Sequence, residues 1–206
     1  YSILVAGGET DEELLEIVVS AISEHFDPGQ ISRVFRPFDL FHDSSLKSVN
    51  ISIDTIIKNI SLNYNLVHRL DKETSGLLVI AKNLKYTKIF GKLFKSRTIK
   101  KIYYALCNGK PKMKQSYLNL LLTSNDKAKK IESKTHYKLL SYNNKISLIQ
   151  FEPKTGKKHQ IRIVAKKLGC PIIGDTKYNL NNSHKLEMLK LNASKLEFKI
   201  ANKKFN

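Results

Sequence analysis

The spacing of apolar residues along the chain first follows the period of a helix. Five apolar residues recur at helical spacing between positions 11 and 26: Leu14, Leu15, Val18, Ile22 and Phe26. Thr10 and Glu13 form a capping box at the start of this segment, and Asp27-Pro28-Gly29 would end it. The pattern therefore predicts an amphipathic helix over 11–26.

Helical spacing returns further along the chain, beside residues suited to cap a helix. Further helices are predicted at residues 53–60, 84–96, 159–168 and near 184–190. Ser52 and Asn83 are suitable N-terminal caps for the first two, because their side chains can accept backbone N–H groups. Gly169 closes the third, since glycine readily adopts the left-handed conformation that ends helices.

Between these segments the apolar pattern takes the period of a strand or forms short apolar runs. Strands are predicted at residues 77–81, 100–107, 135–142, 145–152 and 195–200. Asn143-Asn144 separates two of them and is typical of a two-residue hairpin turn. We therefore expect an α+β fold, with a mixed, largely antiparallel sheet and flanking helices.

The charge is distributed unevenly and suggests a domain boundary. The chain of 206 residues has a net charge of +18, yet residues 1–50 hold nine acidic and three basic residues, so the rest carries +24. Residues 28–50 are irregular, which favours an acidic segment at 1–50 and a basic domain at 51–206. A basic body predicts a polyanionic partner such as RNA, although a lysine-rich composition could merely keep the protein soluble.

Several classes of protein do not fit the sequence. No apolar run approaches the roughly 20 residues of a membrane span, and the first residues lack the basic leader of a signal peptide. Cys107 and Cys170 are isolated, the six histidines show no paired spacing, and no glycine-rich phosphate loop occurs. We expect no membrane, metal or cofactor, and a cytoplasmic location.

The chemistry is expected to rest on the segment from His68 to Gly76. It places Asp71 between basic residues and a Thr-Ser-Gly turn, directly before an apolar strand. Such a loop can present one carboxylate from a braced position. The alternative is an ordinary surface ion pair between Arg69 and Asp71, which would contribute little.

Two later segments offer partners for Asp71. Residues 101–106 place Tyr103 after a basic residue on a strand, although Tyr103 and Tyr104 could simply be sheet residues, one on each face. Residues 156–163 open the predicted helix at 159–168, where Lys158 and Arg162 would share a face that could merely be solvated.

Five segments together resemble the RluA-type pseudouridine synthase family, which includes the ribosomal RluC- and RluD-like enzymes. They occur in the family's order: HRLDKETSG at 68–76, KIYYAL at 101–106, TGKKHQIRI at 155–163, GCPIIGDTKY at 169–178 and LKLNASKLEF at 189–198. The resemblance covers about residues 51–200. It implies a pseudouridine synthase catalytic domain that isomerises uridine to pseudouridine in structured RNA, without a metal or cofactor.

The resemblance also assigns roles to individual residues. Asp71 is the expected catalytic carboxylate, as a nucleophile on the sugar or as a base in a glycal route. Arg162 is expected to pair with Asp71 and to lower its pKa. Tyr103 is expected to stack on the flipped uracil, and Arg69 to enter the space that the nucleotide leaves. Leu191, in the last segment, is expected to contact the substrate.

The chain departs from the family pattern in several places. Lys157 stands where arginine is usual, and Val164 and Asn192 stand where histidine is common. The Asn-Lys-Pro-x-Gly motif at the front of the family's catalytic domain is missing from residues 1–60. We expect a monomer that acts on ribosomal RNA of the large subunit. Transfer RNA as substrate, or a non-catalytic RNA-binding or ribosome-assembly protein, are the alternatives.

Overall fold

The chain folds as two compact units. The computed structural model describes residues 3–6, 16–17, 53–71, 73–123, 130–179, 188–201 and 203–205, with the backbone alone for 3–6, 16–17 and 53–56. The first unit comprises Tyr1–Lys72 and Gly76–Ser96, and the second comprises Glu73–Ser75 and Arg97–Asn206. The domain boundary expected near residue 50 lies outside the described residues and stays a prediction.

The first unit contains a four-stranded sheet with the order β2-β1-β5-β3. Its strands are β1 (Ile3–Ala6), β2 (Glu16–Ile17), β3 (Asn65–Leu66) and β5 (Leu78–Ala81). β1 runs parallel to β5, whereas the β1–β2 and β3–β5 pairs are antiparallel. β5 is buried along its whole length, which confirms the apolar strand predicted at 77–81.

The predicted helix over 11–26 is wrong where the structure describes it. Glu16 and Ile17 pair with Val5 and Leu4 as strand β2. The apolar run that begins at Ile17 is β-branched, and such residues favour strands because their side chains are restricted in helices. The rest of that predicted helix lies outside the described residues.

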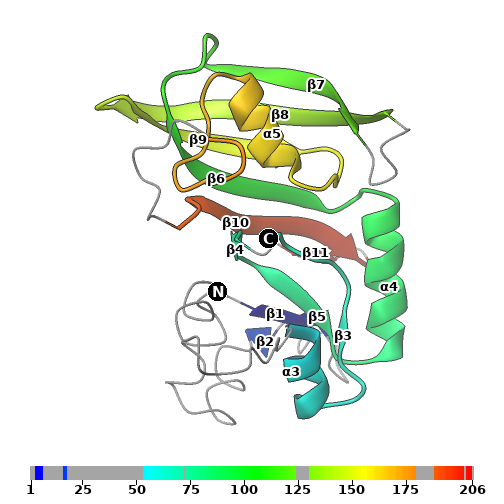
Figure 1. Ribbon diagram of the computed structural model, residues 1–206. Helices are drawn as coiled ribbons and strands as arrows, with labels where there is room; N and C mark the ends of the chain where they lie inside the picture. The colour runs from blue at the N-terminus through cyan, green and yellow to red at the C-terminus, as the bar shows by residue number, and fades with distance from the viewer. Residues whose placement is uncertain are drawn as a thin grey trace, which may run out of the picture. The chain divides into compact units, whose positions relative to one another are not determined.

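The other two helices predicted for the first unit are confirmed. They are α3 (Ile53–Ile60) and α4 (Leu84–Lys95), shown in Figure 1. The Asn83 side chain caps α4 by accepting the backbone N–H of Tyr86 at 3.1 Å. Tyr86 and Phe90, four residues apart on one face of α4, are both buried.

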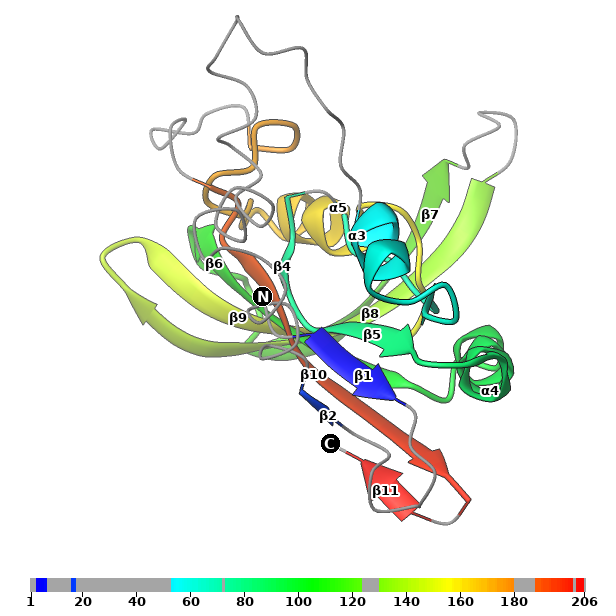
Figure 2. The ribbon, with the colours of Figure 1, turned by 90° about the horizontal axis from the view of Figure 1, so that it is seen from below.

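The second unit is built on an antiparallel sheet with the order β11-β10-β6-β9-β8-β7. Its long strands are β6 (Lys100–Asn108), β7 (Gln115–Thr123), β8 (Lys130–Asn143), β9 (Ile146–Pro153) and β10 (Leu191–Ile200). The short β11 (Lys203–Phe205) returns beside the end of β10 (Figure 2). Ser75, in the two-residue strand β4 (Ser75–Gly76), donates to the carbonyl oxygen of Leu191 at 3.1 Å.

One face of this sheet is covered by helix α5 (Gln160–Lys167), and the core lies between them (Figure 1). Alternate residues of β6, β8 and β9 point into this core, among them Ala105, Tyr137 and Phe151. Ile161, Val164 and Ala165 of α5 pack against them. Gly169 has a φ of 72°, which confirms it as the left-handed residue that ends the helix.

The hairpin between β8 and β9 is confirmed, but its turn lies one residue later than predicted. The strands end at the Asn143–Ile146 pair, so Asn144 and Lys145 form the turn. Their φ values are 48° and 62°, as a two-residue hairpin turn with positive φ at both positions requires. Asn144 tolerates this conformation, and the strand register places Lys145 in the second position.

Two further expectations need correction. β7 was not predicted, although it pairs with β8 along its whole length. The helix predicted near 184–190 is wrong at residues 188–190, which are not helical, and residues 184–187 lie outside the described residues. Leu189 and Leu191 are buried and Met188 is exposed, which fits the period of a strand rather than of a helix. The fold class is confirmed as α+β with a mixed, largely antiparallel sheet flanked by helices.

Candidate active site

The loop that carries Asp71 follows β3 in the first unit. The chain leaves the sheet after Leu66 and returns to it at Leu78. Arg69 is exposed, whereas His68 and Asp71 are half-buried. The His68 ring accepts the backbone N–H of Val79 at Nε2, with a distance of 2.9 Å, and stacks on Phe94 of α4 at 4.7 Å between ring centroids.

In the second unit, the start of α5 is fixed by the buried side chain of Gln160. Its Oε1 accepts hydrogen bonds from the Thr155 hydroxyl at 2.7 Å and from the Lys157 backbone at 3.0 Å. Its Nε2 donates to the Thr135 hydroxyl at 2.9 Å and to the Lys134 carbonyl at 3.1 Å. Both ends of the amide are therefore hydrogen-bonded. These bonds join α5 to β8 and to the loop that precedes α5.

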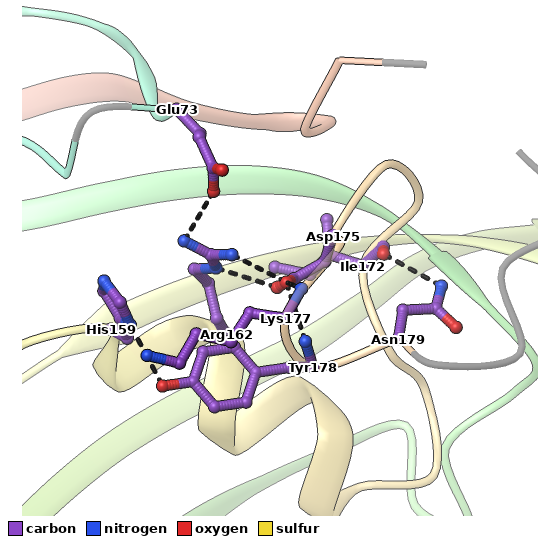
Figure 3. A network of polar contacts seen from close by, with 8 residues as sticks. All are labelled: Glu73, His159, Arg162, Ile172, Asp175, Lys177, Tyr178 and Asn179. Carbon is purple, nitrogen blue, oxygen red and sulfur yellow. Dashed lines mark hydrogen bonds and ion pairs between the residues drawn. The ribbon is translucent and has the colours of Figure 1, made fainter. Parts of the chain in front are cut away.

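Arg162, in the first turn of α5, is bound by two carboxylates (Figure 3). Its side chain is buried, with the residue 3% exposed. Nε and Nη2 donate to the two carboxylate oxygens of Asp175, at 2.8 Å and 2.7 Å. Nη1 lies 2.7 Å from Oε2 of Glu73, which forms an ion pair on the other side. The planar guanidinium is thus held in one orientation.

Asp175 is fully buried and accepts further hydrogen bonds from its own loop. Its Oδ1 accepts the backbone N–H groups of Lys177 at 3.0 Å and Tyr178 at 2.9 Å. Burial alone would raise the pKa of Asp175, but the hydrogen bonds from Arg162 and from these two backbone groups outweigh it, so the pKa lies below its ordinary value. Asp175 is therefore a carboxylate at neutral pH.

An aromatic pair adjoins the same guanidinium. The Arg162 guanidinium carbon lies 5.3 Å from the centre of the Tyr178 ring, and the Tyr178 hydroxyl is 2.9 Å from Nδ1 of His159. His159 has a φ of 53°, a left-handed conformation that is uncommon for a residue with a side chain. His159 therefore precedes α5 rather than starting it, which corrects the predicted helix boundary.

Tyr103 and Leu191 lie on neighbouring strands of the second unit. Tyr103, on β6, packs against the core cluster on the face covered by α5. Lys101, two residues earlier, is partly buried, and burial together with the charge of Arg97 lowers its pKa. Leu191, on β10, pairs with Ala105 and is only 3% exposed, so its side chain belongs to the core.

The structure corrects one expectation about this site and adds residues to it. Lys158 and Arg162 do not share a solvated helical face, because Lys158 precedes α5 and Arg162 is buried. The partners Glu73 and Asp175 were not identified as such, although both lie within segments noted in the sequence. Asp71 and Arg162 belong to different units, so their expected ion pair stays a prediction.

The described residues contain neither a cluster of metal-binding side chains nor a membrane-spanning helix. No group of three or more histidine, cysteine, aspartate or glutamate side chains in the described ranges could hold a metal ion. Likewise, no helix within those ranges is long and apolar enough to cross a membrane.

The sequence matches a known family. A family model described as RNA pseudouridylate synthase matches residues 52–167, which include Asp71, Tyr103 and Arg162. The ribosomal large subunit pseudouridine synthase C of Rickettsia felis is 43% identical over 144 residues, which cover 63% of this chain and 47% of that protein. An uncharacterized RNA pseudouridine synthase of Zymomonas mobilis is 30% identical over 178 residues, covering 78% of this chain and 80% of that protein.

Solved structures agree with this match. Human RNA Pseudouridylate Synthase Domain Containing 4 aligns with a TM-score of 0.59 and 26% identity, covering 69% of each chain. Human RNA Pseudouridylate Synthase Domain Containing 1 shares the fold, with a TM-score of 0.66 at 21% identity over 75% of this chain and 71% of that one. The chain spans about half the length of the Rickettsia felis relative. The resemblance seen in the five sequence segments is confirmed, and the chain belongs to the RNA pseudouridylate synthase family.

Proposed function

We propose that this protein is an RNA pseudouridine synthase that uses Asp71 to isomerise uridine within RNA. The observation that carries this proposal is the family match over residues 52–167, a range that includes Asp71, Tyr103 and Arg162. The buried Arg162 adds physical support, because its two ion pairs fix the position of the charge and the orientation of the guanidinium.

The proposed reaction rearranges the substrate without adding or removing atoms. The bond between N1 of uracil and C1′ of ribose breaks, the base turns, and a bond forms between C5 and C1′. C5 then loses its proton, and N1 gains one. Asp71 either attacks C1′ or removes a proton from the sugar in a glycal route. In both routes a fixed carboxylate offsets the positive character that develops on the sugar.

Arg162 is proposed to hold Asp71 ionised and oriented. A guanidinium has five N–H donors, and Asp175 and Glu73 engage three of its nitrogens through single contacts. We propose that Arg162 belongs to this structural network and also pairs with the carboxylate of Asp71.

The remaining residues are proposed to hold the RNA. Tyr103 stacks on the flipped uracil. Leu191 is buried in the core, so it contributes to the apolar surface beneath the base and does not reach outward. Arg69 is exposed, as an arginine must be to enter the space that the base leaves. The +18 charge favours attraction of the RNA backbone.

The proposed substrate is ribosomal RNA of the large subunit, with transfer RNA as the second candidate. Support comes from the Rickettsia relatives, which are named ribosomal large subunit pseudouridine synthase C. We propose that the protein acts as a monomer in the cytoplasm, where this RNA is found.

Purified protein incubated with unmodified transcripts tests the proposal. Release of tritium from [5-³H]uridine measures isomerisation, with large-subunit ribosomal RNA and transfer RNA transcripts compared. We expect tritium release from the ribosomal transcript, and we expect Asp71→Asn to abolish this release. Equal release by the parent and Asp71→Asn would exclude the proposed chemistry. RNA binding without release would instead indicate a non-catalytic RNA-binding protein.

A second variant tests the role of Tyr103. Tyr103→Phe keeps the ring that stacks on the base but removes the hydroxyl that could relay a proton. A lower kcat with unchanged KM would assign the hydroxyl to proton transfer. Unchanged values for both would assign Tyr103 to stacking alone.

A further inference from the structure

His68 connects the loop of Asp71 to two other elements of the first unit. It lies two residues after the end of β3, where the chain leaves the sheet. Its Nε2 accepts the backbone N–H of Val79, in β5, at 2.9 Å. Its ring stacks on Phe94, in the last turn of α4, with 4.7 Å between centroids and 27° between planes. One side chain therefore joins the base of the loop to a strand and a helix.

The hydrogen bond stands where the sheet would otherwise continue. β3 pairs with β5 through Asn65–Ala81 and Leu66–Ile80, so the next pair in this register would be Val67 and Val79. The ladder stops before that pair, and the His68 ring supplies the acceptor for the Val79 N–H. Val79 is fully buried, and a buried N–H without an acceptor would be costly. Because the His68 side chain supplies this acceptor, the backbone can leave the sheet here and enter the Asp71 loop.

The contact also defines the protonation of the ring. A nitrogen that accepts a hydrogen bond carries no proton, so His68 holds Val79 as a neutral imidazole with its proton on Nδ1. Arginine or lysine at this position would have no acceptor, and phenylalanine would keep only the stack.

We propose that His68 is a positioning residue, which holds the Asp71 loop in its reactive geometry through the Val79 N–H and the Phe94 ring. This inference rests on the proposed function. It assigns to His68 no contact with the substrate; its effect passes through the backbone between His68 and Asp71. A carboxylate that moves by about 1 Å can lose roughly 10²-fold in rate, so a small release of the loop base is sufficient to lower kcat.

Three variants separate the two contacts. His68→Phe keeps the ring stack and removes the acceptor. His68→Gln keeps an acceptor oxygen at a comparable reach and removes the stack. Phe94→Leu leaves His68 intact and removes the stack from the other side. For each, kcat and KM for a ribosomal transcript, the melting temperature and the hydrogen exchange of the Val79 amide are measured.

We expect His68→Phe to lower kcat by about 10- to 100-fold, with KM within about twofold and with Val79 exchange accelerated by about tenfold. His68→Gln should recover most of the kcat and of the protection of Val79, whereas Phe94→Leu should cause a smaller loss. In the parent protein, the ¹⁵N signals of the ring should show a protonated Nδ1 and an unprotonated Nε2.

Several results would overturn the inference. They are a kcat for His68→Phe within twofold of the parent, a kcat for His68→Gln as low as that of His68→Phe, or a rise in amide hydrogen exchange spread evenly over the first unit. The last would show loss of stability rather than of position. If the parent makes no pseudouridine, the proposed function fails, but Val79 exchange in His68→Phe and His68→Gln still decides whether His68 holds the loop.

Discussion

Arg162 and Asp71 are expected to act together, yet their surroundings within the two units differ. Arg162 is buried and bound by Asp175 and Glu73, and Asp175 is bound in turn by its own loop. Asp71 lies in a half-buried loop whose base is tied to the sheet through the ring of His68. A substitution in the Asp71 loop can therefore leave the core intact, whereas a substitution of Arg162 disturbs the core.

This difference predicts where substitutions act. A change at Asp71 should alter the rate of the reaction and leave the stability of the fold nearly constant. A change in the network of Arg162 should lower the stability of the second unit first, because it leaves a buried charge without its partner.

The largest effect is expected for Asp71→Asn. This variant keeps the size of the side chain and removes the carboxylate, so pseudouridine formation should fall by roughly 10³-fold or more. The free energy of unfolding should change by less than about 1 kcal/mol, as is usual for half-exposed sites. Tritium release and urea unfolding measure the two quantities. A loss of stability that matches the loss of activity would remove the contrast between the two regions.

Asp175→Ala should be the most destabilising substitution in the network. It removes both oxygens that bind Nε and Nη2 of Arg162 and leaves the buried guanidinium partly unpaired. Breaking such a buried pair costs about 3–5 kcal/mol. Urea unfolding followed by circular dichroism measures this cost, with Asp175→Asn as the variant of matched size. A cost below about 1 kcal/mol would show that Arg162 is held by other contacts.

The contribution of Asp175 should also depend on pH. Its pKa in the folded protein lies below its ordinary value, so the carboxylate stabilises the fold above the ordinary pKa of the unfolded chain. This contribution is lost as the pH falls through the lower, folded pKa. The difference in unfolding free energy between the parent and Asp175→Asn should thus be constant near neutral pH and should shrink below about pH 4. A constant difference down to pH 2 would contradict this assignment.

Glu73→Gln should have the smallest effect on stability. The Glu73 side chain is 32% exposed, and its buried Oε2 lies beside Nη1 of Arg162 without the geometry of a hydrogen bond, so its pairing is weaker than that of Asp175. We expect a loss of about 0.2–1 kcal/mol, well below that of Asp175→Ala. Urea unfolding of both variants under one condition gives the ranking. Equal losses would mean that Glu73 and Asp175 hold the guanidinium equally.

The sequence was most informative where local rules decide the structure. The cap at Asn83, the helix end at Gly169 and the buried strand before Lys82 follow from single residues or short runs, and all three are confirmed. The hairpin turn was misplaced by one residue because two adjacent asparagines suit such a turn equally well. The strand register, set by long-range pairing, places Asn144 and Lys145 in it.

The partners of Arg162 could not be predicted from local rules. Asp175 is thirteen positions after Arg162, on a loop whose path depends on the packing of Ile172 and its neighbours. Glu73 lies far before Arg162 in the sequence, and the two side chains meet only when the second unit is folded. The motif order indicated the family and its candidate residues, but not which carboxylate faces which nitrogen.

Mapping of pseudouridine in cells shows whether this chain makes pseudouridine through Asp71. Large-subunit ribosomal RNA is sequenced from cells that lack the gene and from cells complemented with the parent or with Asp71→Asn. We expect that at least one pseudouridine disappears on deletion, returns with the parent protein and does not return with Asp71→Asn. An unchanged set of pseudouridines after deletion in both ribosomal and transfer RNA, or full restoration by Asp71→Asn, would contradict it.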